Sequence, residues 1–347
     1  MLKDIAPLVT LVIPCYNHER FVQDCIQSII DQDYRNIELI IIDDGSKDNS
    51  ITKIEEMIPI CQDRFIRFEF RSRSNKGVSA TLNEEIEWAA GQYLSIIASD
   101  DLLHHNKISF LMNKFSLLDD TYAVIFGDVN FINSEGEKIY INKYTRVVEA
   151  NNENCTSSFL EIYTQRRKVK YKAPTVFGSY SSLLEGNYLP AMGAVFKTNY
   201  VRSSGGFTNG VRVEDWNIWL KLSKNYRFHY EQKTVAFYRL HGSNTSVTSS
   251  EKLLLDSLEL LQKEECYAIR NGYSAQFFSQ KANCILRLMG LDYSYFKKYF
   301  KELLHYQMIW ASIKLVFSVA FLKGKGALSR GRSIIRIRGS YRKNHDI

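Results

Sequence analysis

Two pairs of adjacent carboxylates follow apolar runs that have the composition of buried strands. Asp43 and Asp44 end the run in ELIIIDDGS (38–46), and Asp100 and Asp101 end the run in SIIASDDLL (95–103). A single aspartate after a strand commonly caps the next helix, and Asp44 or Asp101 could do so. Doublets at two strand ends instead favour a site for a hard divalent cation, because such ions prefer carboxylate oxygens.

A third acidic pair, Glu214 and Asp215, precedes the segment WNIWLKLS, whose apolar residues have the spacing of one helical face. The helix dipole favours carboxylates at this position, so capping would explain the pair. A carboxylate there could also serve as a general base. His241 follows in YRLHGSNTS. Its imidazole would suit Mn²⁺, although an ordinary hydrogen-bonded loop histidine is an equal reading.

Short apolar runs alternate with helical patterns over the first 130 residues, and these elements must position the acidic pairs. We predict strands at 8–14, 37–43, 65–70 and 93–99, and helices at 19–32, 50–58, 78–91 and 102–115. This alternation indicates parallel neighbours in an α/β sheet. Ligands of such sheets bind beyond the carboxyl ends of the strands. The segments PCYN, DDGS and SDD all fall there.

The first strand does not end in a loop for binding phosphates directly. The following segment, PCYNHERF (14–21), contains no glycine, whereas a dinucleotide-binding turn needs a glycine-rich loop to approach a pyrophosphate. The chain has no P-loop motif either. A metal ion held by the acidic pairs could instead bridge the protein and a diphosphate.

Composition indicates an ordered globular protein. The 347 residues are 45% hydrophobic and 24% charged, with five prolines. The six cysteines have no metal-type spacing, and we identify no signal peptide, which predicts a reducing, cytoplasmic location. We expect a catalytic domain over 1–248 and a helical region over 249–347.

Positive charge is concentrated at the end of the chain. Residues 301–347 contain ten Lys or Arg and two acids, a net charge of +8, so the rest of the chain carries about −1 of the total of +7. The apolar run 308–322 is interrupted by Lys314 and is shorter than the roughly 20 residues of a membrane span. We predict that residues 308–343 bind an anionic membrane surface, at the inner face of the cell membrane. The alternatives are a packed helix with a solvated tail and a homodimer contact. Binding to nucleic acid is not favoured, because the sequence shows no nucleic-acid-binding module.

Five ordered blocks between residues 8 and 245 resemble the family-2 inverting glycosyltransferases. They are the stretch from VTLVIP to DNS (9–50), NKG to SDD (75–101), GGF (205–207), VEDWNIWLKLS (213–223) and YRLHGSNTS. The resemblance implies a GT-A fold, an α/β architecture with a Rossmann-like, mostly parallel sheet flanked by helices, here with a C-terminal helical extension. The nucleotide-sugar half would span about 1–130 and the acceptor half about 131–248.

The resemblance also implies roles for individual residues on the donor side. Asp44 would accept a hydrogen bond from the nucleobase, and Asp100 would contact the nucleotide sugar. Asp101, with His241, would ligate Mn²⁺ or Mg²⁺ on the diphosphate. Lys76 could face phosphate or be an ordinary solvated lysine. The residues that would frame the nucleoside are Pro14, Tyr16, Asn17 and Glu19.

On the acceptor side, the resemblance implies that Asp215 is the general base, with Glu214 as the fallback and Trp216 nearby. The predicted reaction moves a hexose or N-acetylhexosamine from a UDP- or dTDP-sugar to a hydroxyl of a glycan or lipid-linked acceptor. Its context would be bacterial surface polysaccharide synthesis, such as O-antigen or capsule. The alternatives are a nucleotidyltransferase, which would require a Gly- and basic-rich first turn, and a non-catalytic sugar-nucleotide-binding protein.

A run of basic residues could contact an anionic acceptor or be solvated. It consists of Arg166, Arg167, Lys168, Lys170 and Lys172.

Overall fold

The computed structural model describes residues 6–292, 294, 295, 298 and 299, except 143, 145, 153–154, 168, 170–172, 174 and 245–249. Contacts divide the chain into two compact units, residues 1–284 and 285–347. The helix α11 (Ser250–Arg270) therefore belongs to the first unit. The predicted membrane segment 308–343 lies outside the described residues, as do Lys168, Lys170 and Lys172.

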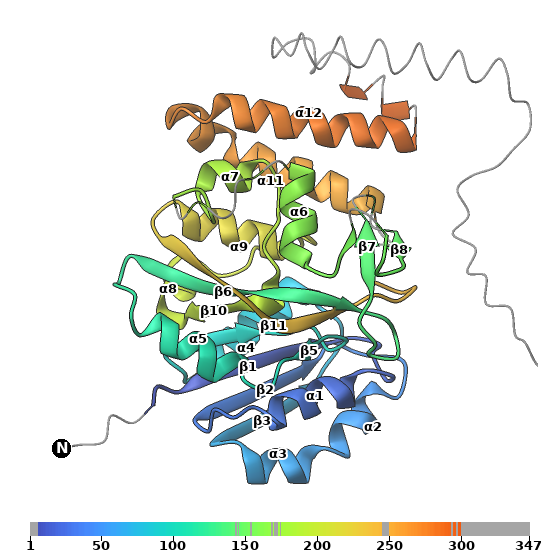
Figure 1. Cartoon of the computed structure of the whole chain (residues 1–347), viewed down its shortest axis with the longest axis vertical. Coiled ribbons are helices and arrows are strands. Elements are labelled where there is room, and N and C mark those ends of the chain that lie inside the picture. Colours follow the sequence, from blue (N-terminus) through green and yellow to red (C-terminus); the bar gives the residue numbers. More distant parts are fainter. Residues whose placement is uncertain are drawn as a thin grey trace, which may run out of the picture. The chain divides into compact units, whose positions relative to one another are not determined.

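An eight-stranded sheet forms the centre of the first unit (Figure 1). Its strand order is β3-β2-β1-β4-β10-β6-β11-β5, and only β10 and β5 run against their neighbours. This mixed, mostly parallel sheet with flanking helices confirms the predicted α/β class. The strands are β1 (Val9–Cys15), β2 (Ile37–Asp43), β3 (Arg67–Ser72), β4 (Tyr93–Ile96), β5 (Leu102–Leu103), β6 (Tyr122–Ile132), β10 (Ala194–Lys197) and β11 (Arg227–Arg239).

Alternate side chains of β1 enter two different layers, as the period of a strand requires. Leu11 and Ile13 join the main apolar core with α1 (Val22–Ile30) and α5 (Lys107–Phe115). Pro14 faces the other way and lines a cavity with Leu82 of α4 (Val78–Trp88) and Trp219 of α9 (Glu214–Ser223). The sheet therefore separates a filled core from a layer that keeps a cavity.

Two predicted helices differ from the observed ones. The segment 50–58 contains α2 (Ser50–Glu55) and the start of α3 (Ile58–Arg64), which carries a proline in its first turn. The segment 102–115 begins with β5, because Leu102 and Leu103 pair with β11, and α5 starts only at Lys107. Neither Asp44 nor Asp101 caps a helix, since both helices begin several residues later.

The chain between β6 and β11 builds a smaller sheet and short helices over the large sheet. Beside α11 lie α7 and α9 (Figure 1), and buried Glu264 of α11 accepts hydrogen bonds from Tyr180 Oη (2.7 Å) and Lys224 Nζ (2.9 Å). The smaller sheet contains β7 (Tyr140–Asn142), β8 (Val147–Val148) and β9 (Cys155–Thr156), and the short helices are α6 (Phe159–Arg167), α7 (Tyr180–Leu184), the 3₁₀ turn η1 (Ala191–Gly193) and α8 (Thr198–Ser203). The helix α12 (Ser274–Leu291) follows α11.

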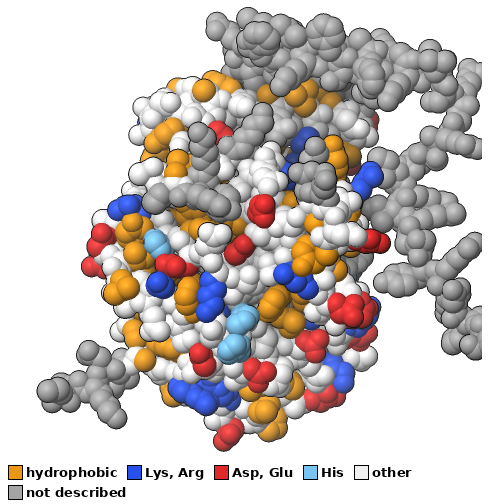
Figure 2. All heavy atoms as spheres, viewed as in Figure 1, with side chains coloured by type: hydrophobic (Ala, Val, Ile, Leu, Met, Phe, Trp, Pro, Cys, Tyr) orange, Lys and Arg blue, Asp and Glu red, His pale blue; other side chains and the backbone are white. Residues whose placement is uncertain are grey.

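Charged side chains of both signs are interspersed on the face of the molecule shown in Figure 2. This mixture matches the sequence, in which residues 1–300 carry a net charge of about −1. Among the described helices, none combines the length and the apolar character that a membrane span requires.

Candidate active site

The loop after β1 is hydrogen-bonded to the loop after β2. Asn17 has a positive φ of 54°, which asparagine tolerates better than most residues. Its N–H donates to Ser46 Oγ (2.8 Å), and its Oδ1 accepts from the N–H of Lys47 (2.7 Å). Glu19 Oε2 accepts from the N–H of Asn49 (2.8 Å). Asn17 and Glu19 thus fix the shape of this loop, and their contact with a nucleoside stays a prediction.

Asp44 is buried at the end of β2 and surrounded by donors. Its carboxylate accepts hydrogen bonds from the Arg73 guanidinium and from the N–H groups of Lys76 (2.8 Å) and Gly77 (2.9 Å). The side chain of Lys76 is exposed, and so is the ring of Tyr16. Asp44 and Arg73 together offer an acceptor and a donor, the pair that a nucleobase edge with an imide N–H and a carbonyl would need.

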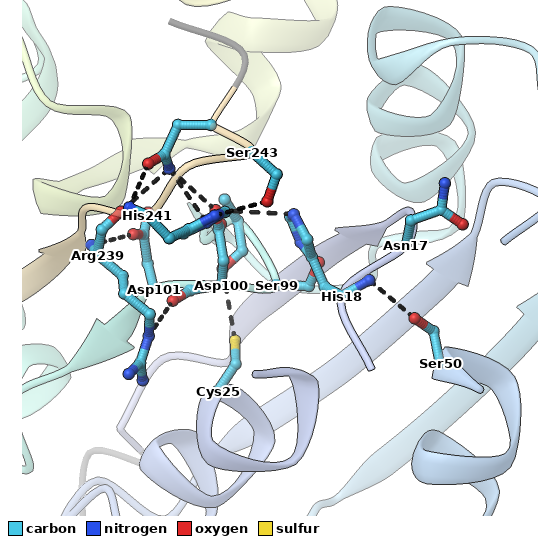
Figure 3. A network of polar contacts seen from close by, with 12 residues as sticks. Asn17, His18, Cys25, Ser50, Ser99, Asp100, Asp101, Arg239, His241 and Ser243 are labelled. Carbon is cyan, nitrogen blue, oxygen red and sulfur yellow. Dashed lines mark hydrogen bonds and ion pairs between the residues drawn. The ribbon is translucent and has the colours of Figure 1, made fainter. Parts of the chain in front are cut away.

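Asp100 lies between two histidines from distant parts of the chain (Figure 3). Its Oδ2 is 2.9 Å from Nε2 of His241 and 3.7 Å from Nε2 of His18. The three ligand-type atoms lie within 4.8 Å of one another. The other ring nitrogens are occupied: Nδ1 of His18 is 2.7 Å from Ser99 Oγ, and Nδ1 of His241 is 2.8 Å from Ser243 Oγ. One carboxylate and two oriented imidazoles form a donor set for a divalent transition metal.

Asp101 is fully buried and lies outside this histidine cluster. Its Oδ1 accepts from the N–H of Arg239 (2.9 Å), while its Oδ2 has no hydrogen-bond partner among the described residues. Burial, and then the charge of Asp100, raise the pKa of Asp101 well above its usual range. We predicted Asp101 as the metal ligand, but Asp100 is the carboxylate beside His241, so the ligand role proposed below goes to Asp100.

Glu214 and Asp215 occupy the first turn of α9, as predicted, and are partly exposed. Both line the cavity that Pro14 and Ala98 also line, with a volume of about 90 Å³. The pair therefore faces the ends of β1 and β4. Trp216 is 3% exposed and its indole donates to the carbonyl of Leu183 (2.7 Å). We assign Trp216 to the contact of α9 with α7 rather than to an acceptor.

The two acids of α9 differ in their proton affinity. Burial, reinforced by the neighbouring charge of Asp215, raises the pKa of Glu214 to about 8. Burial raises the pKa of Asp215 only to about 6, because the N–H of Trp216 (2.7 Å) and the amide of Asn187 (2.5 Å) donate to its carboxylate. At pH 7 Asp215 is therefore ionised while Glu214 keeps its proton, which is the arrangement of one available base.

Asn187 was not among the site residues predicted from the sequence. Its Oδ1 accepts from the N–H of Leu189 (2.9 Å) and its carbonyl accepts from Arg167 Nε (2.5 Å), so its amide is held facing Asp215. Nothing in the local sequence signals this contact, which joins residues 28 positions apart.

Arg239 and His18 were not predicted as site residues either. Arg239 supports the acidic turn after β4 by donating from Nε to the carbonyl of Asp100 (2.8 Å). His18 gave a usable signal, because a histidine directly after a strand end can reach the site that forms there.

Comparisons with known proteins identify the family of the chain. The sequence model described as glycosyl transferase family 2 matches residues 10–185. An uncharacterized glycosyltransferase of Haemophilus influenzae is 35% identical over 247 residues, 71% of this chain and 83% of that protein. Another from Rickettsia felis is 26% identical over 246 residues, 71% of this chain, but the aligned region spans only 36% of its length.

A solved structure shares the fold. A mannosyltransferase from Pyrobaculum calidifontis, in complex with GDP-Man and Mn²⁺, superposes with a TM-score of 0.53. It is 15% identical, and the match covers 92% of this chain and 87% of that one. The sheet and its helices are therefore those of a GT-A glycosyltransferase.

Proposed function

Because the chain belongs to glycosyl transferase family 2, we propose that it moves a sugar from a nucleotide-diphospho-sugar to an acceptor hydroxyl with inversion. The observation that carries this proposal is the placement of Glu214 and Asp215 on a cavity that reaches the ends of β1 and β4, where the amide of Asn187 donates to the carboxylate of Asp215. An ionised carboxylate with a pKa near 6 is a suitable general base at neutral pH.

In the proposed reaction, Asp215 accepts the proton of the acceptor hydroxyl. The acceptor oxygen forms a bond to the anomeric carbon as the bond from that carbon to the diphosphate oxygen breaks, on the opposite face of the sugar. Only the acceptor needs a protein base, so one ionised carboxylate suffices. Asn187 holds the base in place, and Glu214 stays neutral and avoids a second negative charge beside it.

The donor set near β4 fits a divalent metal. Asp100 and His241 would hold Mn²⁺ or Mg²⁺, and the ion would offset the negative charge that develops on the leaving nucleoside diphosphate. The mannosyltransferase with the shared fold was solved with Mn²⁺, which supports this assignment. The unpartnered Oδ2 of Asp101 keeps that residue as the alternative ligand.

The donor is proposed to be a UDP- or dTDP-linked hexose or N-acetylhexosamine. Asp44 and Arg73 support a base with an imide N–H beside a carbonyl, as in uracil or thymine. The acceptor is proposed to be a glycan or lipid-linked glycan in bacterial surface polysaccharide synthesis, reached from the cytoplasmic side of the membrane. The GDP-Man bound by the mannosyltransferase makes GDP-sugars a necessary part of any test.

A donor panel tests the proposal. UDP-, dTDP- and GDP-sugars are titrated calorimetrically into the protein with and without Mn²⁺, and each donor that binds is then assayed for release of its nucleoside diphosphate. We expect one nucleotide class to bind in the presence of metal and to be turned over. Binding without turnover, unchanged in Asp215→Asn, would indicate a non-catalytic sugar-nucleotide-binding protein. No binding across the panel would refute the proposed donor.

A further inference from the structure

We propose that His18 is a third protein ligand of the metal, which makes the site a triad of two histidines and one carboxylate able to bind transition metals before nucleotide arrives. The inference deepens the proposed function and rests on it for a metal near Asp100. His18 lies in the loop after β1, a different segment of the chain from those of Asp100 and His241.

The distances are compatible with an ion shared by the three side chains. The His241 and Asp100 atoms, 2.9 Å apart, could form a hydrogen bond without metal. The distance from His18 Nε2 to Asp100 Oδ2, 3.7 Å, is too long for one. Atoms that bind one ion at about 2.1 Å lie about 3 Å apart when adjacent and about 4.2 Å apart when opposite. Both separations fall within or close to this range.

The ring orientation supports the same role. Ser99 Oγ lies 2.7 Å from Nδ1 of His18, so the imidazole turns its Nε2 toward Asp100 (Figure 3). His241 has the same arrangement through Ser243. Metal-binding histidines commonly use their second nitrogen in such a contact, which fixes the ring and its tautomer.

The backbone of His18 is also held in place. Its N–H donates to Ser50 Oγ (2.8 Å), and Asn17 before it is held at both its N–H and its side chain. Phe21 lies beside the His241 ring, with centroids 4.8 Å apart. Because its position is already fixed, a ligand of this kind binds an ion without the entropic cost of ordering a loop.

The accessibility of the triad is uneven. The side chain of His18 is 23% exposed, compared with 9% for Asp100 and 6% for His241. The cluster is therefore reached from the His18 side. An octahedral ion with three protein ligands would leave its other positions to phosphate oxygens and water.

Two imidazoles imply a particular metal preference. Nitrogen ligands suit Mn²⁺ and, more strongly, Co²⁺, whereas Mg²⁺ prefers an all-oxygen shell and keeps its waters. We expect the nucleotide-free protein to bind Co²⁺ more tightly than Mn²⁺, and Mn²⁺ more tightly than Mg²⁺.

The test measures metal binding without nucleotide, by calorimetry with Co²⁺, Mn²⁺ and Mg²⁺ and by the visible absorption of bound Co²⁺. His18→Ala should weaken Co²⁺ and Mn²⁺ binding at least about tenfold, since even an outer-shell partner is worth about 10–100-fold. The Co²⁺ spectrum should change as well. His105→Ala, which alters an exposed histidine, should bind as the wild type does.

His18→Gln separates loss of the ligand from misfolding, because it keeps a polar side chain in the loop. It should show the same loss of metal affinity with an unchanged melting temperature. Wild-type affinity in both His18 variants, or no Co²⁺ and Mn²⁺ binding by the nucleotide-free wild type, would overturn the inference. Glycosyl transfer that needs Mn²⁺ but not His18 would leave the proposed function intact and refute the triad. Metal binding that depends on His18, without turnover of any donor, would support the triad and refute the proposed function.

Discussion

Two pairs of adjacent acids, Asp100–Asp101 after β4 and Glu214–Asp215 on α9, are similar in sequence and different in surroundings. The first pair meets imidazoles, with the carboxylate of Asp100 2.9 Å from His241. The second pair meets an apolar cavity and neutral donors, the amide of Asn187 and the N–H of Trp216. Surroundings of the first kind suit a cation, and those of the second kind suit a proton.

The comparison shows how one residue type acquires two chemistries. In each pair one acid has a pKa well above that of its neighbour: Asp101 in the first pair and Glu214 in the second. Two negative charges side by side are unfavourable, so in each pair the charge of one acid raises the pKa of the other. The acid with the lower pKa is held by the groups around it, as in other paired-carboxylate sites.

Removing the base should have the largest effect. Asp215→Asn keeps the shape of the side chain but cannot accept the acceptor proton, so kcat should fall by about 10²–10⁴-fold. Metal-dependent donor binding, measured by calorimetry, should be unchanged, because the proposed metal site lies on the other pair. Asp63→Asn on the exposed surface of α3 is the matched control. Equal loss of donor binding would show that the two pairs do not have separate roles.

Replacing each acid of the first pair by asparagine, in separate variants, distinguishes the two candidate metal ligands. Asp100→Asn should weaken Mn²⁺ binding at least about tenfold, because it removes the carboxylate that faces both histidines. Asp101→Asn should have a smaller effect on Mn²⁺ affinity in the same calorimetric titration. The opposite order would restore Asp101 as the ligand, in accordance with the sequence-based prediction.

Asn187→Ala should move the pH dependence of the base. The lost hydrogen bond favours the ionised form of Asp215. A bond to a charged group is worth about 1.5–3 kcal/mol, so the pKa should rise by about one unit from its value near 6. The acid limb of kcat/KM should shift upward by that amount, with little change at pH 8.5. Asn225→Ala, an exposed change near the end of α9, should leave the profile in place.

A pH profile of Asn187→Ala that overlaid the wild-type profile would assign Asn187 a structural role only. A uniform fall of kcat/KM at every pH would have the same meaning, because a shifted pKa acts on the acid limb alone.

Glu214→Gln should have the smallest effect on turnover and a visible effect on stability. The pKa of Glu214 is about 8 in the folded protein and near 4.5 when unfolded. The wild type therefore loses stability as the pH rises between these values, and the glutamine variant does not. Its melting temperature should exceed that of the wild type by about 2 °C or more at pH 8, and by less at pH 5. An equal difference at both pH values would contradict the raised pKa.

The sequence by itself determined the architecture and the three acidic pairs. Strand and helix periods are local properties, so the alternation over residues 8–115 predicted the four parallel strands β1–β4. It failed where distant residues decided the outcome. Leu102 and Leu103 have helical neighbours in sequence, but they form an edge strand because β11 offers them partners.

Only the tertiary structure decided how the surroundings of neighbouring acids differ. Asp100 and Asp101 are adjacent and identical in type, and the turn after β4 places one beside His18 and His241 and the other beside the backbone of Arg239. Asn187 reaches Asp215 across 28 residues. A pKa or a ligand set depends on distances of a few ångströms between groups that are far apart in the chain, and sequence spacing carries no measure of such distances.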